Sequence, residues 1–575
     1  MSHSNHPLRV AAAAVAASFS LVAAAAQPRP DAGTLLEQQQ QRERLPEAPS
    51  AAPVVEKAAP ARPALAPSPT LRVTATDFTF SGNSVFSAAE LRATVQSFIG
   101  KTLDFEGLND AAGRVQRYYR ERGYFLAVAY LPAQQIRNGS VEIAVLEGRL
   151  GRLDLQMGPP TRLRESFARG VMDAHLRPGD HITESGLERP LLLLRDLPGI
   201  DLSSSLGPSK TQLGAADLTV RVKESPRRFN GYVDFDNGGN RFTGEHRLGL
   251  NLNTNNLSGF GDLLSFRGFV TEEDMKFGRV AYVIPVWYYG TRVGVSYTQF
   301  EYRLEKDFAA LQAHGEGDVS TIYALHPVIR TRNANLLVQV AAEEKNLHDR
   351  VDSTSTVEDR KVNSAKVGAV GDFRDGLFSG GLNSYGVTYT DGRLALSPPA
   401  LQAADVAAGT GLRTSGDFGK LNIDVRRLQR ITDSFNLLIA YSGQAASKNL
   451  TASEKFSLGG PNGVRAYPVG EAPGDSGYLF TTELRYIVPK FTLLGGDVTA
   501  SIFWDQGRVR TNQEPLATNF TNYRALAGYG FGLSVGREGR FLFRANVAAQ
   551  AENEAPIADS AKRDPHLWFQ AVKWF

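Results

Sequence analysis

Residues 247–253 read RLGLNLN, and this stretch decides the fold class of the chain. Its leucines alternate with polar or small residues, so all three leucines fall on one face of a β-strand. The same alternation returns at residues 420–426 (KLNIDVR) and 541–548 (FLFRANVA). Over residues 229–575 a period of two replaces any helical period. This half of the chain is therefore predicted to be a series of antiparallel strands.

The lengths of these strands and of their connections favour a membrane barrel over a soluble sandwich. About 16 alternating segments of roughly 10 residues are present, which is the length that a tilted strand needs to cross a bilayer. Short turns are expected at Val286–Gly290, Thr331–Asn333, Ile431–Asp433 and Arg537–Gly539. Long loops are expected at Leu347–Arg360, Leu394–Gly416, Ser447–Ser476 and Arg508–Arg524. Short turns on one side and longer loops on the other are typical of an outer-membrane barrel, predicted here for residues 225–575.

Two small α+β domains are predicted before the barrel, at residues 71–148 and 149–224. Each shows the order strand, helix, helix, strand, strand. In the first domain, one stripe of a predicted helix carries Leu108, Ala112, Val115 and Tyr119. The fold class is thus mainly β: an antiparallel transmembrane barrel preceded by two similar α+β modules.

The N-terminal 70 residues are interpreted as three segments. Residues 1–26 form a secretory signal peptide, with Arg9 before an apolar run and a small-residue cleavage site. Residues 27–47 are expected to form a polar helix with few apolar residues and no face to bury in a core. This helix is interpreted either as a pore plug or as a disordered leader. Residues 48–70 are rich in Pro and Ala and are expected to be an extended linker. No segment has the roughly 18 consecutive apolar residues of a transmembrane helix.

Composition argues against several functions. The formal net charge of +3 offers no basic field for nucleic acid, and the absence of cysteine removes thiolate chemistry. No metal-binding spacing of the nine histidines is found, so no metal, cofactor or catalytic residue is expected. The G-x-S-x-G pattern at Gly532–Gly536 is interpreted as barrel wall, and the acidic stretch at residues 234–245 as a hairpin loop. Trp287–Tyr289 is interpreted as part of an interfacial aromatic girdle.

Short motifs recur in the α+β modules at residues 78–83 (FTFSGN), 123–134, 139–148 and 189–199. They resemble strands, turns and helices of the two polypeptide-transport-associated (POTRA) domains of the two-partner secretion transporters (TpsB family), of the haemolysin and filamentous haemagglutinin secretion-activation type. The turn and strand residues that carry the resemblance are Phe80, Gly82, Asn83, Gly123, Tyr124 and Pro132.

A motif in the loop at residues 447–476, between the eleventh and twelfth predicted strands, extends this resemblance to the barrel. The stretch Val464-Arg465-Ala466-Tyr467 resembles the family's Val-Arg-Gly-Tyr signature, which lies at the tip of a loop that folds back into the lumen. Ala466 stands where the family has Gly.

A second barrel motif lies on the thirteenth predicted strand, where Phe503, Asp505 and Gly507 resemble the family's Phe-x-Asp-x-Gly pattern. By alternation Asp505 points into the lumen. The resemblance implies an ion pair between Arg465 and Asp505 that attaches the loop to the wall, which suits a guanidinium and a carboxylate. From the residues alone, without the resemblance, Arg465 is interpreted instead as one of many solvated loop arginines.

The resemblance implies an outer-membrane pore that recognises an unfolded secreted protein in the periplasm and passes it to the cell surface without nucleotide hydrolysis. The expected partners are this exoprotein cargo, outer-membrane lipid and, during insertion, the barrel assembly machinery. The chain is expected to be a monomer that is neither an enzyme nor a nucleic-acid binder. The alternatives are a β-barrel protein assembly factor, for which more POTRA domains are expected, and a barrel carrying an enzyme.

Overall fold

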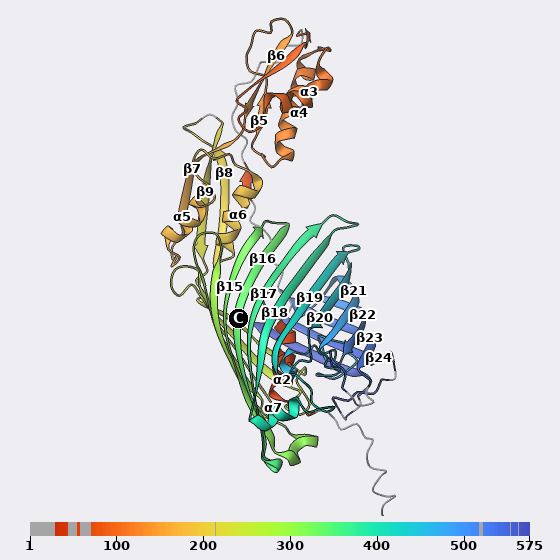
Figure 1. The fold of residues 1–575 in the computed structure, drawn as a ribbon. Coiled ribbons are helices and arrows are strands. Elements are labelled where there is room, and N and C mark those ends of the chain that lie inside the picture. The colour runs from red at the N-terminus through yellow and green to blue at the C-terminus, as the bar shows by residue number, and fades with distance from the viewer. Residues whose placement is uncertain are drawn as a thin grey trace, which may run out of the picture.

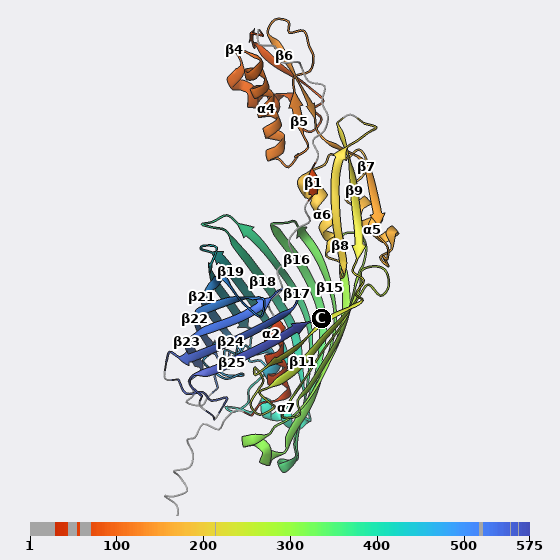
Figure 2. The ribbon, with the colours of Figure 1, turned by 180° about the vertical axis from the view of Figure 1, so that it is seen from behind.

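The computed structural model describes residues 29–43, 55–57, 71–212, 214–516, 521–552, 554–559, 561 and 563–575. The predicted signal peptide and most of the predicted linker lie outside the described residues. Two small domains are stacked at one end of a barrel, and a helix lies inside that barrel (Figures 1 and 2). In the part of the chain that is described, no helix combines the length and apolarity needed to cross a membrane.

The barrel is a closed antiparallel sheet of 16 strands, in chain order, so the predicted fold is confirmed. The strands are β10 (Phe229–Asp236), β11 (Arg247–Asn255), β12 (Leu263–Thr271), β13 (Lys276–Pro285), β14 (Arg292–Arg303), β15 (Ala313–Arg330), β16 (Ala334–Val351), β17 (Thr356–Asp375), β18 (Gly381–Ser397), β19 (Gly416–Arg430), β20 (Phe435–Ala446), β21 (Ser476–Leu493), β22 (Gly496–Arg510), β23 (Tyr523–Arg537), β24 (Phe541–Gln550) and β25 (His566–Trp574). Pairing of β10 with β25 closes the ring.

Alternation gives the barrel an apolar outside and a polar inside. On β16, Val338 and Val340 are exposed on the outer surface, whereas Gln339 between them lines the lumen. Val340 pairs with Val367 of β17, which is also exposed. Closure leaves no unpaired strand edge, which a bilayer would penalise heavily. The outer surface is therefore suited to lipid and the lumen to water.

Two of the predicted long loops are wrong in part. The segment 347–360 is not a loop: β16 continues to Val351, and Val351 pairs with Thr356 at the start of β17. The polar residues of this segment suggested a loop. They belong to two strands that extend beyond the apolar band of the outer surface. The loop predicted from Leu394 begins only after Ser397 and contains the helix α7 (Pro399–Asp405).

The first POTRA-like domain has a sheet in the order β3 (Asp77–Ser81), β6 (Ser140–Leu146), β5 (Val128–Tyr130). A small pair, β2 (Val73–Thr74) and β4 (Thr102–Leu103), lies apart from it. Helices α3 (Ala88–Val95) and α4 (Phe105–Glu121) contribute to one apolar core with the sheet. Ser87 and Glu90 form a capping box at α3, and Asp104 caps α4. These caps fix where the two helices begin.

The second domain has a sheet in the order β1 (Val55–Lys57), β8 (Ile200–Pro208), β9 (Ala215–Glu224), β7 (Arg149–Met157). Helices α5 (Glu165–Asp173) and α6 (Glu184–Arg195) contribute to its own apolar core. The short strand β1 comes from the predicted linker and pairs in parallel with β8. One edge of this sheet is therefore occupied by a segment that precedes the first domain.

Candidate functional site

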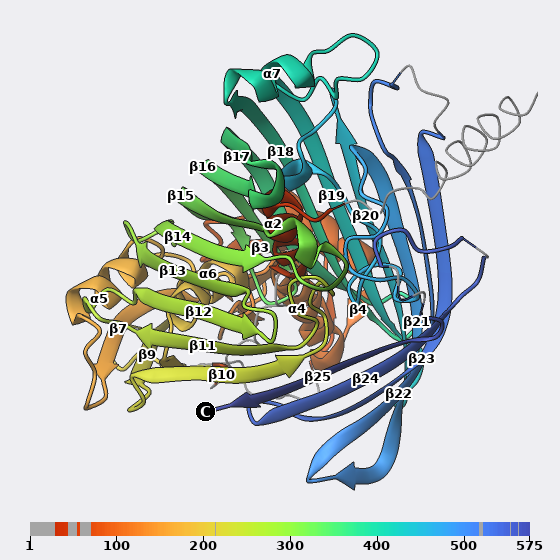
Figure 3. The ribbon, with the colours of Figure 1, turned by 90° about the horizontal axis from the view of Figure 1, so that it is seen from below.

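The site is the barrel lumen, which a loop and a helix fill from within. The loop between β20 and β21 folds back into the barrel, and the helix α2 (Ala32–Glu43) lies beside it, as the end-on view shows (Figure 3). What remains open is a cavity of about 890 Å³, lined by residues of α2, the loop and the wall.

The tip of the loop is attached to the wall by Arg465. Its Nε and Nη2 donate to the two carboxylate oxygens of Asp505 at 2.8 and 2.9 Å, and its backbone N–H also donates to Asp505. The guanidinium stacks 3.3 Å above the ring of Phe503. Both partners are almost fully buried. The structure thus brings together the arginine and the aspartate that sequence reasoning paired.

Further partners of Arg465 were not expected from the sequence. Its Nη1 donates to Glu483 at 2.9 Å, and Trp568 of β25 donates its indole N–H to the Arg465 carbonyl at 2.7 Å. Thr481 donates to Asp505 at 3.0 Å. Strand register explains why these residues are neighbours. In the β21–β22 pair, Thr481 lies opposite Asp505 and Glu483 lies opposite Phe503. Only strand pairing, not sequence spacing, reveals these neighbours.

The other loop-motif residues are buried beside Arg465. Val464, Ala466 and Tyr467 are fully buried, and the Tyr467 N–H donates to the Val464 carbonyl at 3.0 Å. Ala466 does not adopt a left-handed backbone conformation, so its position does not require glycine. An ideal Cβ on Gly528 of β23 would lie 2.5 Å from the Ala466 methyl. The Ala466 methyl group, which a glycine would lack, therefore lies against a position of the wall that has no side chain.

Gly507 allows a close approach between wall and loop. An ideal Cβ at this position would lie 2.5 Å from Leu458 Cδ2 of the loop, so any side chain here would displace the loop. The base of the loop has its own attachments. Glu471 accepts hydrogen bonds from the backbone of Ile557 and Ala558 and pairs with Arg524 at 2.6 Å. The loop is thus attached along its length and not only at its tip.

The helix α2 is buried, which corrects the expectation that residues 27–47 have no face for a core. Ala32, Leu35 and Leu36 are at most 3% exposed and pack among lumenal aromatic side chains such as Phe269 and Phe300. The sequence signal was weak because three apolar residues suffice inside a narrow lumen. Glu37 accepts a hydrogen bond from Ser457 of the loop, and Gln39 and Gln40 line the open cavity.

The N-terminus of α2 is held by carboxylates. The Ala32 N–H donates to Asp349 of β16 at 2.9 Å, and the Thr34 N–H donates to Asp31 at 2.8 Å. Carboxylates at this end satisfy free N–H groups and suit the helix dipole. Arg360 of β17 pairs with Asp349 at 2.7 Å. The start of the helix is therefore bound to the β16–β17 hairpin.

The predicted residues of the first POTRA-like domain lie in its turns and beside its core. Gly82 and Gly123 both adopt positive φ values, of 76° and 90°, which explains why glycine occupies these turns. The Asn83 side chain donates to the Phe86 carbonyl at 2.9 Å, and the Tyr124 ring contacts Phe86 edge-on. Phe80 packs against the core and Pro132 follows β5.

Glu147, near the end of the motif at residues 139–148, joins the two small domains. It accepts from the backbone of Ser84 and Val85 at 2.7 Å each and from the Tyr119 hydroxyl at 2.8 Å. It also contacts His181 of the second domain at 2.9 Å. Burial raises the pKa of Glu147, but these hydrogen bonds outweigh it and lower the pKa to about 2.

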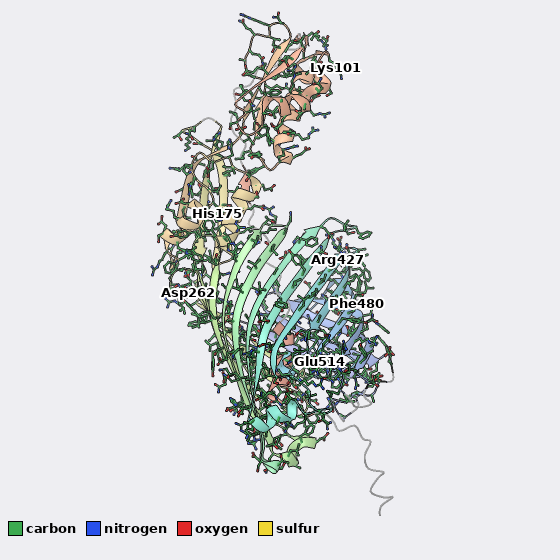
Figure 4. The ribbon with its side chains drawn as sticks, in the orientation of Figure 1. Lys101, His175, Asp262, Arg427, Phe480 and Glu514 are labelled. Atoms are coloured by element: carbon green, nitrogen blue, oxygen red, sulfur yellow. The ribbon has the colours of Figure 1, made fainter. Side chains whose placement is uncertain are left out.

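The second domain docks on short turns at one end of the barrel. Arg330 makes two hydrogen bonds to Asp196, at 2.7 and 2.6 Å. Tyr288 and Tyr289 contact Phe167 and His175 of this domain, and the place of Trp287–Tyr289 in an aromatic girdle stays a prediction. Figure 4 labels His175 in this domain and Asp262 near its junction with the barrel. Burial lowers the pKa of His175, which keeps that ring neutral at the interface.

Among the described residues, no group of three or more histidine, aspartate or glutamate side chains could hold a metal ion. Asp234 and Asp236, part of the calcium-like stretch, instead pair with Arg267 and Arg247 in the wall. The G-x-S-x-G pattern lies within β23. Ion pairs, hydrogen bonds and apolar packing join the loop and α2 to the wall.

A closed barrel with a polar lumen, an infolded loop and N-terminal POTRA-like domains defines an outer-membrane transporter. The model of the haemolysin secretion/activation protein family ShlB/FhaC/HecB matches residues 214–535, and the ShlB-type POTRA domain matches residues 73–148. The chain therefore belongs to the ShlB/FhaC/HecB family, the transporters of two-partner secretion.

Relatives and solved structures agree with this assignment. The chain is 30% identical over 489 residues to the heme/hemopexin transporter protein HuxB of Haemophilus influenzae, covering 84% of each chain. It is 24% identical to the outer membrane transporter CdiB of Dickeya dadantii, over 76% of each. The structure of CdiB from Escherichia coli shares its fold, with a TM-score of 0.72 and 20% identity over 95% of this chain and 99% of that one.

Family membership settles the class of function. The chain is a non-enzymatic outer-membrane transporter that exports a secreted exoprotein, and its POTRA domains lie in the periplasm. The domain-bearing end of the barrel is therefore periplasmic, and the opposite end, with α7 and the β16–β17 hairpin, faces the cell surface (Figure 1).

Proposed function

We propose that the described structure is the resting state of an exoprotein exporter, closed by the loop and by α2 together. The observation that carries this proposal is that both obstacles in the lumen are held only by ion pairs, hydrogen bonds and packing. Such contacts can be exchanged for contacts with a cargo, whereas a covalent or fully packed core cannot.

Cargo enters as an unfolded chain that pairs with sheet edges of the POTRA domains. Main-chain hydrogen bonds of this kind bind many sequences and still hold the chain extended. β1 pairs with residues 204–206 of β8, so the edge strands among those described are β1 and β7 in the second domain and β3 and β5 in the sheet of the first. The second domain is docked at the periplasmic mouth and the first is stacked on it, so a segment bound at β7 is held close to the lumen (Figure 1).

Translocation then requires α2 to leave the lumen and the loop to retract. No nucleotide is needed, because capture in the periplasm and folding of the cargo outside give the movement a direction. Outer-membrane lipid surrounds the apolar outer face, the barrel assembly machinery inserts the chain, and one copy suffices for one pore. Nucleic acid, metal and cofactor have no part in this mechanism.

Co-expression tests the proposal. The chain is expressed with the exoprotein encoded beside it, and release of that exoprotein into the medium is measured by immunoblotting. We expect release with the intact chain and none with a chain that lacks residues 71–148 but still inserts. Export by the truncated chain at the full level would refute recognition by the POTRA domain.

A further inference from the structure

A short 3-10 helix in the lumenal loop, Ala452–Glu454, is held on the barrel wall by a buried ionic cluster. Lys345 of β16 donates to one carboxylate oxygen of Glu454 at 2.6 Å, and Lys420 of β19 pairs with the other at 2.8 Å. Glu454 and Lys345 are each 1% exposed. In the order of the barrel, β16 stands six strands from β22, which carries Asp505, so this attachment lies on a different wall from that of Arg465.

The backbone of the same turn is also fixed. The Glu454 carbonyl accepts hydrogen bonds from Lys420 at 3.0 Å and from the Gln444 side chain at 2.9 Å. Gln444 donates in addition to the carbonyl of Asp475, at the end of the loop. The charges are balanced further by Glu343, which pairs with Lys345 and Lys366. A buried network of this kind is stable only while every member keeps its partner.

The plug helix rests on this same turn. An ideal Cβ at Gly33 would lie 2.8 Å from the backbone nitrogen of Ser453 and 3.2 Å from the Ala452 methyl, so α2 and the turn are in backbone contact. Farther along the helix, Ser457 of the loop donates to Glu37 at 2.8 Å. The turn therefore contacts the wall on one side and the plug on the other.

We propose that Glu454 is a positioning residue that couples the plug to the loop. While Lys345 and Lys420 hold Glu454, the turn forms a fixed seat for α2, and the loop and helix stay in the lumen together. When this cluster separates, the seat moves with the loop and α2 loses its contact surface. Opening is then one event and not two. This inference rests on the proposed function, because it assumes that the described state is the closed one.

Because the chain contains no cysteine, the introduced cysteines are the only residues that take up the spin label. In the full chain in detergent, spin labels at Gln39 of α2 and Ser384 of β18 report plug position. A second pair, at Asn462 of the loop and Ser384, reports loop position. All three residues line the lumenal cavity. Distances are measured without cargo, so failure of secretion and failure of this inference remain distinguishable.

We expect one short distance for each label pair in the unsubstituted chain. In Glu454→Gln, both pairs should gain a second, longer distance of matching population, and the single-channel conductance should rise. The matched control is Glu344→Gln, next to Lys345 on the same strand, which breaks an exposed pair with Lys361. The control should keep the short distances.

A second variant separates coupling from general damage. Lys345→Met with Glu454→Gln removes one of the two buried cations that the single substitution would leave without Glu454. If α2 stays in place only while Glu454 is bound to the wall, the helix and the loop should still leave together in this double variant. The inference is overturned if the double variant restores the short distances, if Glu454→Gln leaves both pairs unchanged, or if the helix leaves while the loop stays.

Discussion

At the scale of single residues, Arg465 carries most of the attachment at the loop tip. It satisfies Asp505 with two parallel hydrogen bonds, contacts Glu483 and stacks on Phe503. Removing it leaves the buried Asp505 carboxylate without a cation, which costs about 3–5 kcal/mol at a buried pair, whereas Glu483 keeps Arg485. The loop tip should then separate from the wall.

We therefore predict that Arg465→Ala inserts normally but exports much less cargo. Heat-dependent migration of the barrel in gels reports insertion, and immunoblotting of the medium reports export. Arg465→Lys should be intermediate, since lysine keeps the charge and loses the planar fork. Arg393→Ala, which removes an exposed pair with Asp417, is the control. Equal export by Arg465→Ala and this control would contradict the role of the attachment.

Ala466 and Gly528 should be coupled. An added methyl at Gly528 would collide with Ala466. We expect Gly528→Ala to reduce export, Ala466→Gly to have little effect, and the double variant to recover most of the loss. Neighbouring residues of this kind couple by about 0.5–3 kcal/mol. A double variant no better than Gly528→Ala alone would show that the two positions are independent.

At the scale of elements, α2 is the plug of the proposed closed state. Deleting residues 31–45 should raise the ion conductance of the pore in planar bilayers, because the helix occupies the lumen. Gly33→Leu should raise it as well, without a deletion, since its side chain cannot fit against Ser453. Gly113→Leu in α4, where an added Cβ meets nothing within 4 Å, is the control. Unchanged conductance in the deletion would remove the plug role.

The junction of the POTRA domains should depend on acid. The pKa of Glu147 is lowered from 4.5 to about 2 in the folded chain, so its contribution is complete above about pH 4.5. As the pH falls from there toward 2, the carboxylate is protonated and the contribution is lost. Spin labels on the two domains should therefore report a fixed distance at pH 7, which begins to broaden near pH 3 and broadens further toward pH 2.

Two variants check the assignment of this pH dependence. Glu147→Gln should broaden the distance already at pH 7 and flatten the change between pH 5 and 3. Glu165→Gln, which removes an exposed pair with Arg169, should behave like the unsubstituted chain. A full pH response in Glu147→Gln would assign the transition to another group.

The elements that could be predicted from the sequence were those whose apolar residues recur with a clear period. Alternation identified the barrel strands, because one face of each meets lipid and the other water. It did not reveal that β16 and β17 extend to a tight turn at residues 352–355, since polar strands and polar loops look alike outside the apolar band. Nor did it reveal the burial of α2, whose few apolar residues are decisive only inside a lumen.

At the scale of the whole molecule, the order of the domains could be predicted from the sequence, but the way in which they dock could not. Arg330 and Asp196 lie far apart in the sequence and carry no motif, yet they bind the second POTRA domain to the barrel. The partners of Arg465 on β21 and β25 were hidden for the same reason. Contacts that depend on strand register and on domain placement appear only in three dimensions.

Docking of the second POTRA domain should therefore depend on Arg330. We predict that Arg330→Ala widens the distance distribution between spin labels on this domain and on the barrel rim, because Asp196 loses both hydrogen bonds. Arg427→Ala, which removes a pair with Asp375 near the same end of the barrel, is the control. A distribution as narrow as that of the control would assign the docking to the other contacts of this domain with the barrel, which include the pair of Arg332 with Glu188 and the hydrogen bonds from Arg189 to the Pro327 and Val328 carbonyls.

The placement of α2 has a topological consequence. Its first residues contact the β16–β17 hairpin on the outer side of the membrane, where Asp31 lies 3.6 Å from Arg360, whereas β1, the next described segment, pairs with β8 of the second periplasmic domain. The described segments 29–43 and 55–57 thus place one stretch of chain at both ends of the pore. Before any cargo arrives, the barrel has either closed around a polypeptide or been threaded by one.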